Sequence, residues 1–332
     1  MLDLSILVPA YNAEESLPHC LDSLLNQGLN KDQYEILVMN DGSTDSTEEI
    51  LSAYQKLHPQ LTFFTQTNSG DTATRTALLK KATGNYIYYI DSDDYLQPHS
   101  LSKVLGWAKE KDQCLVGFGT QYVHGFPTDQ SDFQEMDLSQ DPKLQDLSVD
   151  QFIEQKPNHR YELWWYMVKR NIIQEHGISF SDYHIVADVV FTMKCLFHSK
   201  QISYFDLPLH YYVQGATSFM RNKNFDKREN LIRNTCAMIL DFSKTIRAAG
   251  EQKLVSAENL KILRARQDIF TLSCYIKMAL NKSKKKDFLA RTKAFKKAGV
   301  LPVKQHYFGN EVDKSRYFLA KCGVNLFSAF VK

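Results

Sequence analysis

The sequence predicts an α/β fold with a mostly parallel sheet flanked by helices, followed by a helical, basic C-terminal extension. Three observations lead to this prediction. Strand-like and helix-like segments alternate through the first hundred residues, an order that places strands parallel in one sheet. The strand-like segments are apolar throughout, which indicates a sheet covered on both faces. After about residue 222 the pattern becomes helical almost throughout.

The alternating elements can be assigned in chain order from their periodicity. Apolar runs predict four strands, at Leu4–Pro9, Tyr34–Met39, Leu61–Thr65 and Tyr86–Ile90. Apolar residues at helical spacing and capping residues predict three helices between them, at Glu14–Gln27, from Asp45 or Ser46 to about Leu57, and at Thr72–Ala82. Each strand ends in polar or turn-forming residues. Because ligands of such sheets bind beyond the carboxyl ends of the strands, we expect the four endings to form a site.

The rest of the chain is less regular. Thr128–His159 is polar and turn-rich, typical of a surface loop with one short helix. Tyr161–Gly177 has helical spacing, and Val186–Phe197 is a further predicted helix. Short strands are expected at Ile202–Phe205 and Leu209–Val213. One apolar stripe at helical spacing predicts a long helix nearer the C-terminus; it consists of Ile262, Ala265, Ile269, Leu272, Ile276 and Ala279.

Charge divides the 332-residue chain into two parts, although its net charge is only +2. Residues 1–220 hold 15 Lys and Arg against 29 Asp and Glu, a net charge of −14. Residues 221–332 hold 25 against 9, a net charge of +16. We therefore expect a ligand-binding body over 1–220 and a helical basic region over 221–332 that contacts a surface or a partner.

The composition predicts a cytoplasmic protein. The N-terminus lacks the basic segment and cleavage site of a signal peptide, and no apolar run is long enough to span a bilayer. The cysteines are dispersed, with no spacing suited to zinc, and are expected to be reduced and mostly buried. They are Cys20, Cys114, Cys195, Cys236, Cys274 and Cys322.

Asp91-Ser92-Asp93 follows a predicted buried strand directly and is the clearest chemical motif. Carboxylates two residues apart at a strand end suit Mn²⁺ or Mg²⁺, which take oxygen ligands and pair with substrate phosphates. The alternative is a cap and turn before the helix near Pro98. Asp41, which ends the preceding strand in the same way, favours the ligand site.

Two further residues at the strand ends have alternative interpretations. The ring of Tyr11 either stacks on a nucleobase or packs in the core. Arg75 either contacts a diphosphate or forms a surface ion pair. A dinucleotide-dependent oxidoreductase is excluded because no G-x-G-x-x-G follows the first strand. A sugar nucleotidyltransferase is excluded because its Gly-rich, basic first loop is missing.

Four blocks of the sequence resemble family 2 glycosyltransferases, which have the GT-A fold. They read VPAYNAEESLPHCLDSLLNQ, EILVMNDGSTDST, the NSG–TRT segment and GNYIYYIDSDDYL, in the order of the family, over about residues 4–100. The resemblance continues more loosely through ADVVFTMKCLF and LPLHYYVQGATS to about residue 220. It implies an inverting enzyme that transfers a sugar from a nucleotide-diphosphate donor, with a UDP-sugar favoured, to a hydroxyl acceptor.

The resemblance also implies roles for the residues at the strand ends. Asp41 would bind the base and Asp91 the ribose. Asp93, with Asp91, would hold the Mn²⁺ or Mg²⁺ ion on the diphosphate. The remaining residues of the donor pocket would be Pro9, Tyr11, Glu14, Asn68, Arg75 and Ser92.

The catalytic base implied by the resemblance is Asp188. Relatives carry the base in a Glu-Asp pair that opens a helix, and this chain reads Ala187-Asp188. Taken alone, Asp188 is more simply a carboxylate that complements the helix dipole. The family resemblance implies instead that Asp188 removes the acceptor proton.

Other positions depart from the family pattern. Thr76 and Leu78 stand where many relatives have Asn and Gly after the arginine. His210 begins an aromatic triplet that lacks the usual basic residue after it, so His210 or Arg221 is a candidate contact to the metal or diphosphate. Trp164 and Trp165 either stack on an acceptor sugar or pack in the core. These departures keep one alternative open: a catalytically silent nucleotide-sugar-binding subunit or scaffold of a transferase complex.

The basic tail predicts a partner for the C-terminal region. Lys282–Lys297 holds eight Lys or Arg against one Asp with Phe and Leu between them, and Tyr317–Val331 is rich in Phe, Leu and Val. This pattern is typical of a helix on an anionic membrane surface, and a solvated bundle face is the alternative. Nucleic acid is excluded because the body is acidic and no binding module is present. An oligomer stays open.

From the resemblance we therefore expect a peripheral enzyme at the inner face of the cell membrane. Bacterial relatives extend saccharides carried on a polyprenyl-diphosphate lipid there. The acceptor would be such a saccharide, and the product a capsule, exopolysaccharide or wall polymer.

Overall fold

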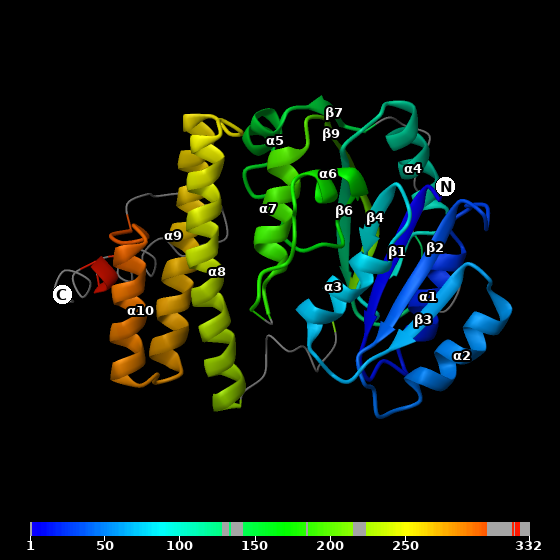
Figure 1. The fold of residues 1–332 in the computed structure, drawn as a ribbon, viewed down its shortest axis with the longest axis horizontal. Helices are drawn as coiled ribbons and strands as arrows, with labels where there is room; N and C mark the ends of the chain where they lie inside the picture. Colours follow the sequence, from blue (N-terminus) through cyan, green and yellow to red (C-terminus); the bar gives the residue numbers. More distant parts are fainter. Residues whose placement is uncertain are drawn as a thin grey trace. The chain divides into compact units, whose positions relative to one another are not determined.

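The computed structural model describes residues 2–127, 133, 142–183, 185–214, 224–303, 321 and 323–325 (Figure 1). The chain forms two compact units. The first consists of Met1–Ser148, Glu162–Phe180 and His198–Ala216, and the second of Val149–Tyr161, Ser181–Phe197 and Thr217–Lys332. Two segments of the body thus fold with the C-terminal helices, and one of them carries Asp188. A functional boundary at residue 220 stays a prediction.

The first unit is built on one mixed sheet with the strand order β3-β2-β1-β4-β8-β6-β9-β5, and β7 pairs with β9. Strands β1 to β4 pair in parallel, while β8 is antiparallel to β4 and β6. The strands are β1 (Leu4–Ala10), β2 (Tyr34–Asn40), β3 (Leu61–Thr65), β4 (Tyr86–Tyr89), β5 (Tyr95–Leu96), β6 (Leu115–Val123), β7 (Leu144–Leu147), β8 (Tyr166–Lys169) and β9 (Ile202–Val213). The predicted α/β fold is confirmed, but the sheet is mixed rather than mostly parallel. The parallel pairs are those among β1 to β4 and that of β6 with β9, whereas β5, β7 and β8 pair antiparallel with their neighbours.

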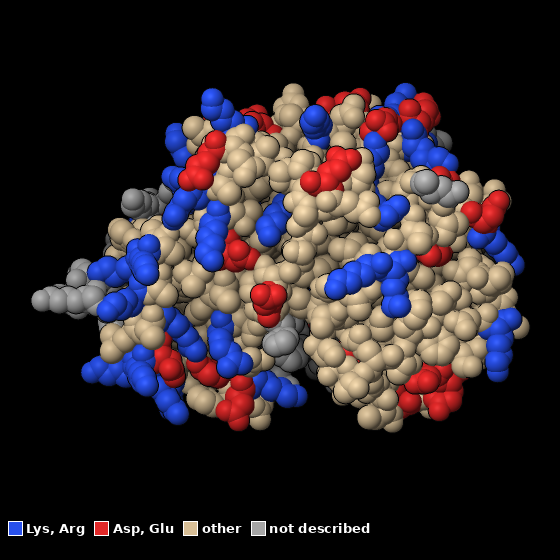
Figure 2. Space-filling view, viewed as in Figure 1, with Lys and Arg blue, Asp and Glu red and all other residues tan. Residues whose placement is uncertain are grey.

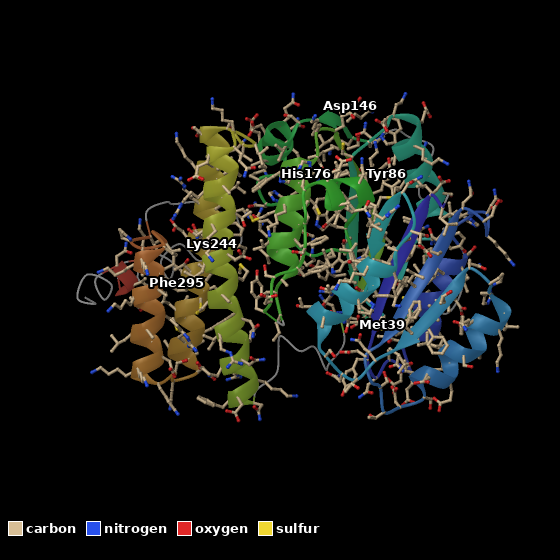
Figure 3. All side chains as sticks on the ribbon, viewed as in Figure 1. Met39, Tyr86, Asp146, His176, Lys244 and Phe295 are labelled. Carbon is tan, nitrogen blue, oxygen red and sulfur yellow. The ribbon has the colours of Figure 1, made fainter. Side chains whose placement is uncertain are left out.

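Helices cover both faces of this sheet. They are α1 (Leu17–Leu25), α2 (Thr47–Leu57), α3 (Asp71–Lys81), α4 (Ser100–Glu110) and α6 (Arg170–Glu175). Ile6 and Val8 on β1 belong to the buried cluster that includes α1 and α4. Alternate side chains point to the other face, where the Tyr89 hydroxyl donates to the backbone carbonyl of Arg75 on α3. Figure 3 shows Met39 and Tyr86 among these strands, and both are buried. The apolar strands therefore reflect a sheet buried on both faces.

One predicted helix is wrong. Tyr161–Gly177 forms turns, the strand β8 and the short helix α6. The backbone of β8 pairs with β4 on one side and β6 on the other. Because a strand between two partners satisfies its hydrogen bonds on both edges, this pairing overrides the helical spacing of the side chains. The two short strands predicted after residue 201 are one strand, β9, with a register shift opposite Gly119.

The second unit is helical. It contains α5 (Val149–Gln155), α7 (Asp188–His198, of which all but the last residue belongs to this unit), α8 (Phe225–Glu251), α9 (Ala257–Leu280) and α10 (Lys285–Lys297). Side chains cap two of them, because Asn224 accepts from Asp226 N and Lys227 N, and Ser256 accepts from Asn259 N. Phe295 on α10 is fully buried (Figure 3) and its ring lies 6.0 Å from that of Tyr275 on α9. The predicted helical character is confirmed over the described residues 224–303, and most of Tyr317–Val331 lies outside the described residues.

The apolar stripe predicted for α9 is only partly the buried face. Ala265 and Leu272 are buried, but Ile276 is 44% exposed and Ala279 is exposed. The buried face consists instead of mixed residues, among them Leu263, Gln267, Thr271, Cys274, Tyr275 and Met278. Since Gln267 and Thr271 donate to backbone carbonyls, polar residues on this face are buried with hydrogen-bond partners, and hydrophobicity alone does not locate it.

Two expectations about compartment concern the described residues. The five cysteines that the structure describes are free and buried, and Cys322 lies outside the described residues. Within the described part of the chain, no helix is long and apolar enough to cross a membrane.

His159 gives the second unit a predicted dependence of stability on pH. Its ring packs against Phe152 and Tyr161, and its Nδ1 lies 2.9 Å from the Lys156 carbonyl oxygen. Burial and the nearby Arg266 guanidinium lower the pKa of His159 to about 3. The folded protein therefore keeps His159 neutral, while the unfolded chain binds a proton below about pH 6.5.

Stability is thus expected to fall as the pH drops from about 6.5 toward 3, at about 1.4 kcal/mol per pH unit from this group. The substitution His159→Gln removes the titrating group. Urea unfolding at pH 7, 6 and 5 should give a shallower decline for the variant than for the wild type. Parallel declines would show that His159 does not carry the effect.

Candidate active site

The donor-site residues predicted from the sequence lie at the carboxyl ends of the parallel strands. Strands β1, β2 and β4 end at Ala10, Asn40 and Tyr89. Because these strands are parallel, the residues that follow them lie along the same rim. The rim therefore brings together the segments at residues 11–14, 41–47, 66–71 and 91–94.

The first two loops of the rim are joined by side-chain hydrogen bonds. Asn12 N donates to Ser43 Oγ at 2.9 Å, and Asn12 Oδ1 accepts from Thr44 N at 2.8 Å. Glu14 Oε2 accepts from Ser46 N at 3.0 Å. Glu14 thus holds the loop before α2 in place, while the Tyr11 side chain is 52% exposed on the rim. Pro9 is half-buried within β1.

Asp41 organises the third loop of the rim. Its side chain is only 4% exposed, and its two carboxylate oxygens accept from Ser69 N at 2.8 Å, Gly70 N at 2.9 Å and the Gln66 side chain at 2.7 Å. Gly42 has a φ of 72°, and a Cβ atom there would lie 2.7 Å from the backbone nitrogen of Asn68. Asp41 and Gly42 therefore bring the exposed Asn68 close to the end of β2.

Three carboxylates meet at the end of β4. Ligand oxygens of Asp91, Asp93 and Asp94 all lie within 4.8 Å of one another. Desolvation and repulsion by the other two carboxylates raise the pKa of Asp93 to about 7. Burial and repulsion by Asp91 raise the pKa of Asp94 to about 8. Negative charge is thus costly here without a partner cation. A set of oxygen ligands at this spacing fits a divalent ion such as Mg²⁺ or Mn²⁺.

Arg75 places a positive charge beside this cluster. Its guanidinium lies 2.8 Å from Asp91 Oδ1 and 2.7 Å from Asp71 Oδ2. The side chain is 14% exposed, so it is held between the two carboxylates rather than extended into solvent. Sequence reasoning named Arg75 and Asp91 separately, and the structure brings them together. Ser92 is half-buried between the two predicted metal-binding aspartates.

Asp94 is a member of the cluster that sequence reasoning missed. The signal was present as the third aspartate of Asp91-Ser92-Asp93-Asp94. Asp94 is fully buried; its Oδ1 accepts from Val213 N at 2.9 Å and its Oδ2 lies 3.1 Å from Nε2 of His210. His210 is also fully buried, and its ring stacks on Trp164 at 4.5 Å. His210 therefore faces the carboxylate cluster through Asp94.

The remaining candidates from the sequence are the two tryptophans, Arg221 and Asp188. Trp164 and Trp165 are 5% and 2% exposed, so packing is the interpretation that the structure supports for both. Arg221 lies outside the described residues. Asp188 is the first residue of α7 and belongs to the second unit, where its side chain is half-buried and Oδ1 accepts from Val189 N at 3.0 Å. Its catalytic role stays a prediction.

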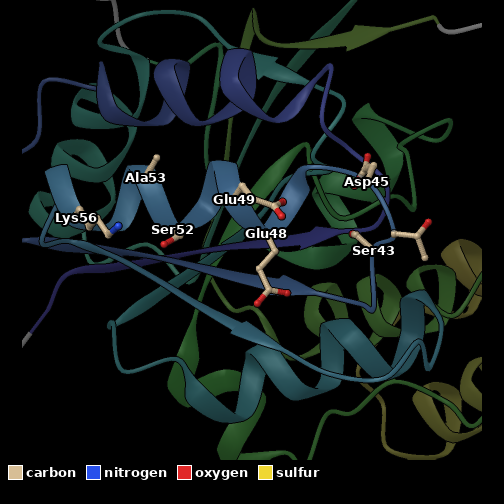
Figure 4. A pocket seen from close by; sticks show the side chains of 8 residues that line it. Ser43, Asp45, Glu48, Glu49, Ser52, Ala53 and Lys56 are labelled. Carbon is tan, nitrogen blue, oxygen red and sulfur yellow. The ribbon is translucent and has the colours of Figure 1, made fainter.

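A pocket of about 620 Å³ lies beside the rim, along α2 (Figure 4). It is lined by Ser43, Thr44, Asp45, Glu48, Glu49, Ser52, Ala53 and Lys56. None of the donor-site residues predicted from the sequence lines this pocket. The pocket and the carboxylate cluster therefore share no residue.

Comparison with known proteins gives a consistent picture. A family model described as Glycosyl transferase family 2 matches residues 5–193. A poly(ribitol-phosphate) beta-glucosyltransferase of Bacillus spizizenii is 32% identical over 206 residues, which are 61% of this chain and 31% of that protein. The poly(ribitol-phosphate) beta-N-acetylglucosaminyltransferase TarS of Staphylococcus aureus is 27% identical over 215 residues, 64% of this chain and 36% of TarS. The chain spans about a third of the length of these two relatives.

Two solved structures share the fold. The crystal structure of S. aureus TarS 1-349 in complex with UDP-GlcNAc matches with a TM-score of 0.69 at 21% identity, covering 98% of this chain and 89% of that one. The mannosyltransferase PcManGT of Pyrobaculum calidifontis, in complex with GDP-Man and Mn²⁺, matches with a TM-score of 0.55 at 16% identity, covering 98% and 87%. At these identities the matches establish the fold, and the predicted GT-A fold is confirmed.

Proposed function

The chain belongs to glycosyl transferase family 2, and we propose that it transfers a sugar from a UDP-sugar to a hydroxyl of a saccharide acceptor. The observation that carries the proposal is the cluster of Asp91, Asp93 and Asp94 at the end of β4. Nucleotide sugars bound to TarS and PcManGT, which share the fold, support a nucleotide-sugar donor. The relatives that act on poly(ribitol-phosphate) support a bacterial cell-surface polymer as the product.

The residues along the rim would each contact a different part of the donor. Asp41 would recognise the base through the carboxylate lone pair that its three loop contacts leave available. The exposed ring of Tyr11 would stack on that base, with Asn68 nearby on the loop that Asp41 holds. Asp91 would accept from the ribose while Arg75 keeps it in position. Pro9, Glu14 and Ser92 would shape the pocket through the backbone around them.

Asp93 and Asp91 would hold a Mn²⁺ or Mg²⁺ ion, with Asp94 beside them. When bound, such an ion neutralises charge that develops on the departing diphosphate. The protein contributes the geometry of the ligands. Each carboxylate oxygen of Asp94 is held by one contact with β9, Oδ1 by Val213 N and Oδ2 by His210 Nε2. The mutual repulsion that raises the pKa of Asp93 would be relieved by the cation.

Inversion at the anomeric carbon would proceed by a single displacement. The acceptor oxygen attacks the anomeric carbon, the bond from that carbon to the diphosphate oxygen breaks, and the nucleoside diphosphate leaves. Asp188 would take the acceptor proton as the new glycosidic bond forms, a contribution typically of about 10² to 10⁴ in rate. The acceptor would be a saccharide carried on a polyprenyl diphosphate and would therefore lie at a membrane. The basic C-terminal region would contact the anionic surface of that membrane.

Donor binding gives the first test of this proposal. We expect a UDP-sugar such as UDP-N-acetylglucosamine, with Mn²⁺ present, to stabilise the protein against unfolding. A donor at 100 times its dissociation constant should raise the free energy of unfolding by about 2.7 kcal/mol. A thermal-shift panel of UDP-, GDP- and ADP-sugars with and without Mn²⁺ measures this. A panel in which no nucleotide sugar moves the transition would overturn the proposed donor class.

A further inference from the structure

Exposed apolar side chains gather at one end of the second unit. Phe225, in the first turn of α8, is 47% exposed. Ile276 and Leu280, one turn apart at the end of α9, are 44% and 76% exposed. These are three of the six large apolar side chains that stand out as exposed in the described part of the chain. Such side chains in a cluster mark interaction surfaces more often than scattered ones do.

Hydrogen bonds between the helices place these side chains at the same end. The carboxylate of Glu229 on α8 accepts from the Asn281 amide at 3.1 Å and the Ser283 hydroxyl at 2.7 Å, just after α9, and it pairs with Arg291 on α10. Phe225 lies one turn before Glu229 on the same side of α8. Figure 1 shows the start of α8, the end of α9 and the start of α10 together at the lower end of this unit. We call residues 225–229 and 276–286 the docking end.

The docking end is strongly basic. It holds seven Lys and Arg against two acids, a net charge of +5. The basic residues are Lys227, Arg228, Lys277, Lys282, Lys284, Lys285 and Lys286. All but Lys277, which is half-buried, are exposed. Figure 2 shows Lys and Arg side chains gathered over this end with fewer acidic ones between them.

The combination points to lipid rather than to protein. Six of the seven basic residues are lysines, and lysine is depleted in protein–protein interfaces, where arginine and aromatic residues are enriched. Lysines around exposed Phe and Leu side chains are typical of segments that lie in an anionic membrane interface. Basic residues near an anionic leaflet are attracted to it, and the attraction falls off within about a Debye length.

We propose that the docking end binds an anionic lipid surface, with Phe225, Ile276 and Leu280 entering the headgroup region and the lysines contacting lipid phosphates. This inference rests on the proposed function in that a lipid-linked acceptor gives the enzyme a reason to be at a membrane. It goes further by assigning the contact to one end of the helical unit. The lysines nearer the C-terminus of α10, Lys293, Lys296 and Lys297, lie outside it.

Vesicle co-sedimentation of the full chain tests the proposal, with phosphatidylcholine vesicles that contain or lack phosphatidylglycerol. The wild type should bind only the anionic vesicles, and more weakly at high salt. Each basic residue near the surface strengthens binding by about fivefold, so Lys284→Glu, Lys285→Glu and Lys286→Glu together, which reverse three charges, should weaken it at least about 100-fold. The triple variant Lys293→Glu, Lys296→Glu and Lys297→Glu has the same change in charge. Its binding to the vesicles should weaken at most about tenfold, because salt screens the effect of charges that lie away from the docking end.

A second pair of variants tests the contribution of the apolar side chains to vesicle binding. Leu280→Ser should weaken binding to anionic vesicles about tenfold, because the leucine no longer transfers into the interface. Leu57→Ser, at a side chain that is 73% exposed on α2, should leave binding unchanged. Equal losses in the two lysine triples, or unchanged binding of Leu280→Ser, would overturn the docking end. A wild-type dimer that Leu280→Ser converts to a monomer would overturn it in favour of a second copy of this chain.

Release of UDP from the donor in solution, without vesicles, separates this inference from the proposed function. Docking-end variants that release UDP at the wild-type rate but fail to sediment support the docking end as a separate surface. A wild type that sediments but turns over no donor supports the docking end and overturns the proposed reaction.

Discussion

Asp93→Asn is expected to lower turnover of the UDP-sugar by about 10³-fold, which is the scale seen when one group that stabilises transition-state charge is removed. The substitution keeps the size of the side chain but removes one of the three carboxylates that lie within 4.8 Å of each other. A neutral amide holds a divalent ion more weakly, so the Mn²⁺ concentration for half-maximal rate should rise as well. Initial rates of UDP release across a Mn²⁺ series measure both effects.

Glu49→Gln is the matched control for Asp93→Asn. It also removes one negative charge from the first unit, but Glu49 lines the pocket along α2 rather than the carboxylate cluster. We expect its rate and Mn²⁺ dependence to match those of the wild type. If Glu49→Gln were the damaging substitution and Asp93→Asn the harmless one, the chemistry would belong to the α2 pocket.

Asp188→Asn is expected to lower turnover by about 10³- to 10⁴-fold, at the upper end of what a general base contributes. The amide cannot take the acceptor proton, yet the proposed donor-binding residues are untouched. The dissociation constant for the UDP-sugar, measured by calorimetry, should therefore stay within about threefold of the wild type, a difference below 1 kcal/mol. The effect separates catalysis from binding.

Asp182→Asn serves as the control for this prediction, because Asp182 is an exposed acid in the same segment of the second unit. It should leave both turnover and donor affinity unchanged. Turnover at the wild-type rate in Asp188→Asn would show that Asp188 only complements the dipole of α7.

The N-terminal half of the sheet was predictable because its signals are local. β1 to β4 are apolar runs that each pair with a neighbour in parallel, and the helices between them carry apolar residues at helical spacing. β8 was not predictable in this way. Its residues have helical spacing, but they form a strand because β4 and β6 present free edges on both sides. The competition is decided by tertiary pairing, which periodicity does not register.

The candidate site shows the same division. Asp91 and Asp93 were visible from two carboxylates at a strand end. The contact of Asp94 with His210 was not, because it depends on β5 pairing with β9, which places residues more than a hundred positions apart next to each other. The loop contacts of Asp41 were hidden for a related reason. They depend on the absence of a side chain at Gly42, which leaves room for the chain after β3 to approach the end of β2.

The carboxylate cluster at the end of β4 is proposed to belong to a working glycosyltransferase. The most direct measurement is UDP release from a UDP-sugar by the wild type, Asp93→Asn and Asp188→Asn, each with and without Mn²⁺. We predict Mn²⁺-dependent release by the wild type and a loss of about 10³-fold in both variants. Tight donor binding with no release by the wild type would contradict the claim and identify a silent nucleotide-sugar-binding subunit instead.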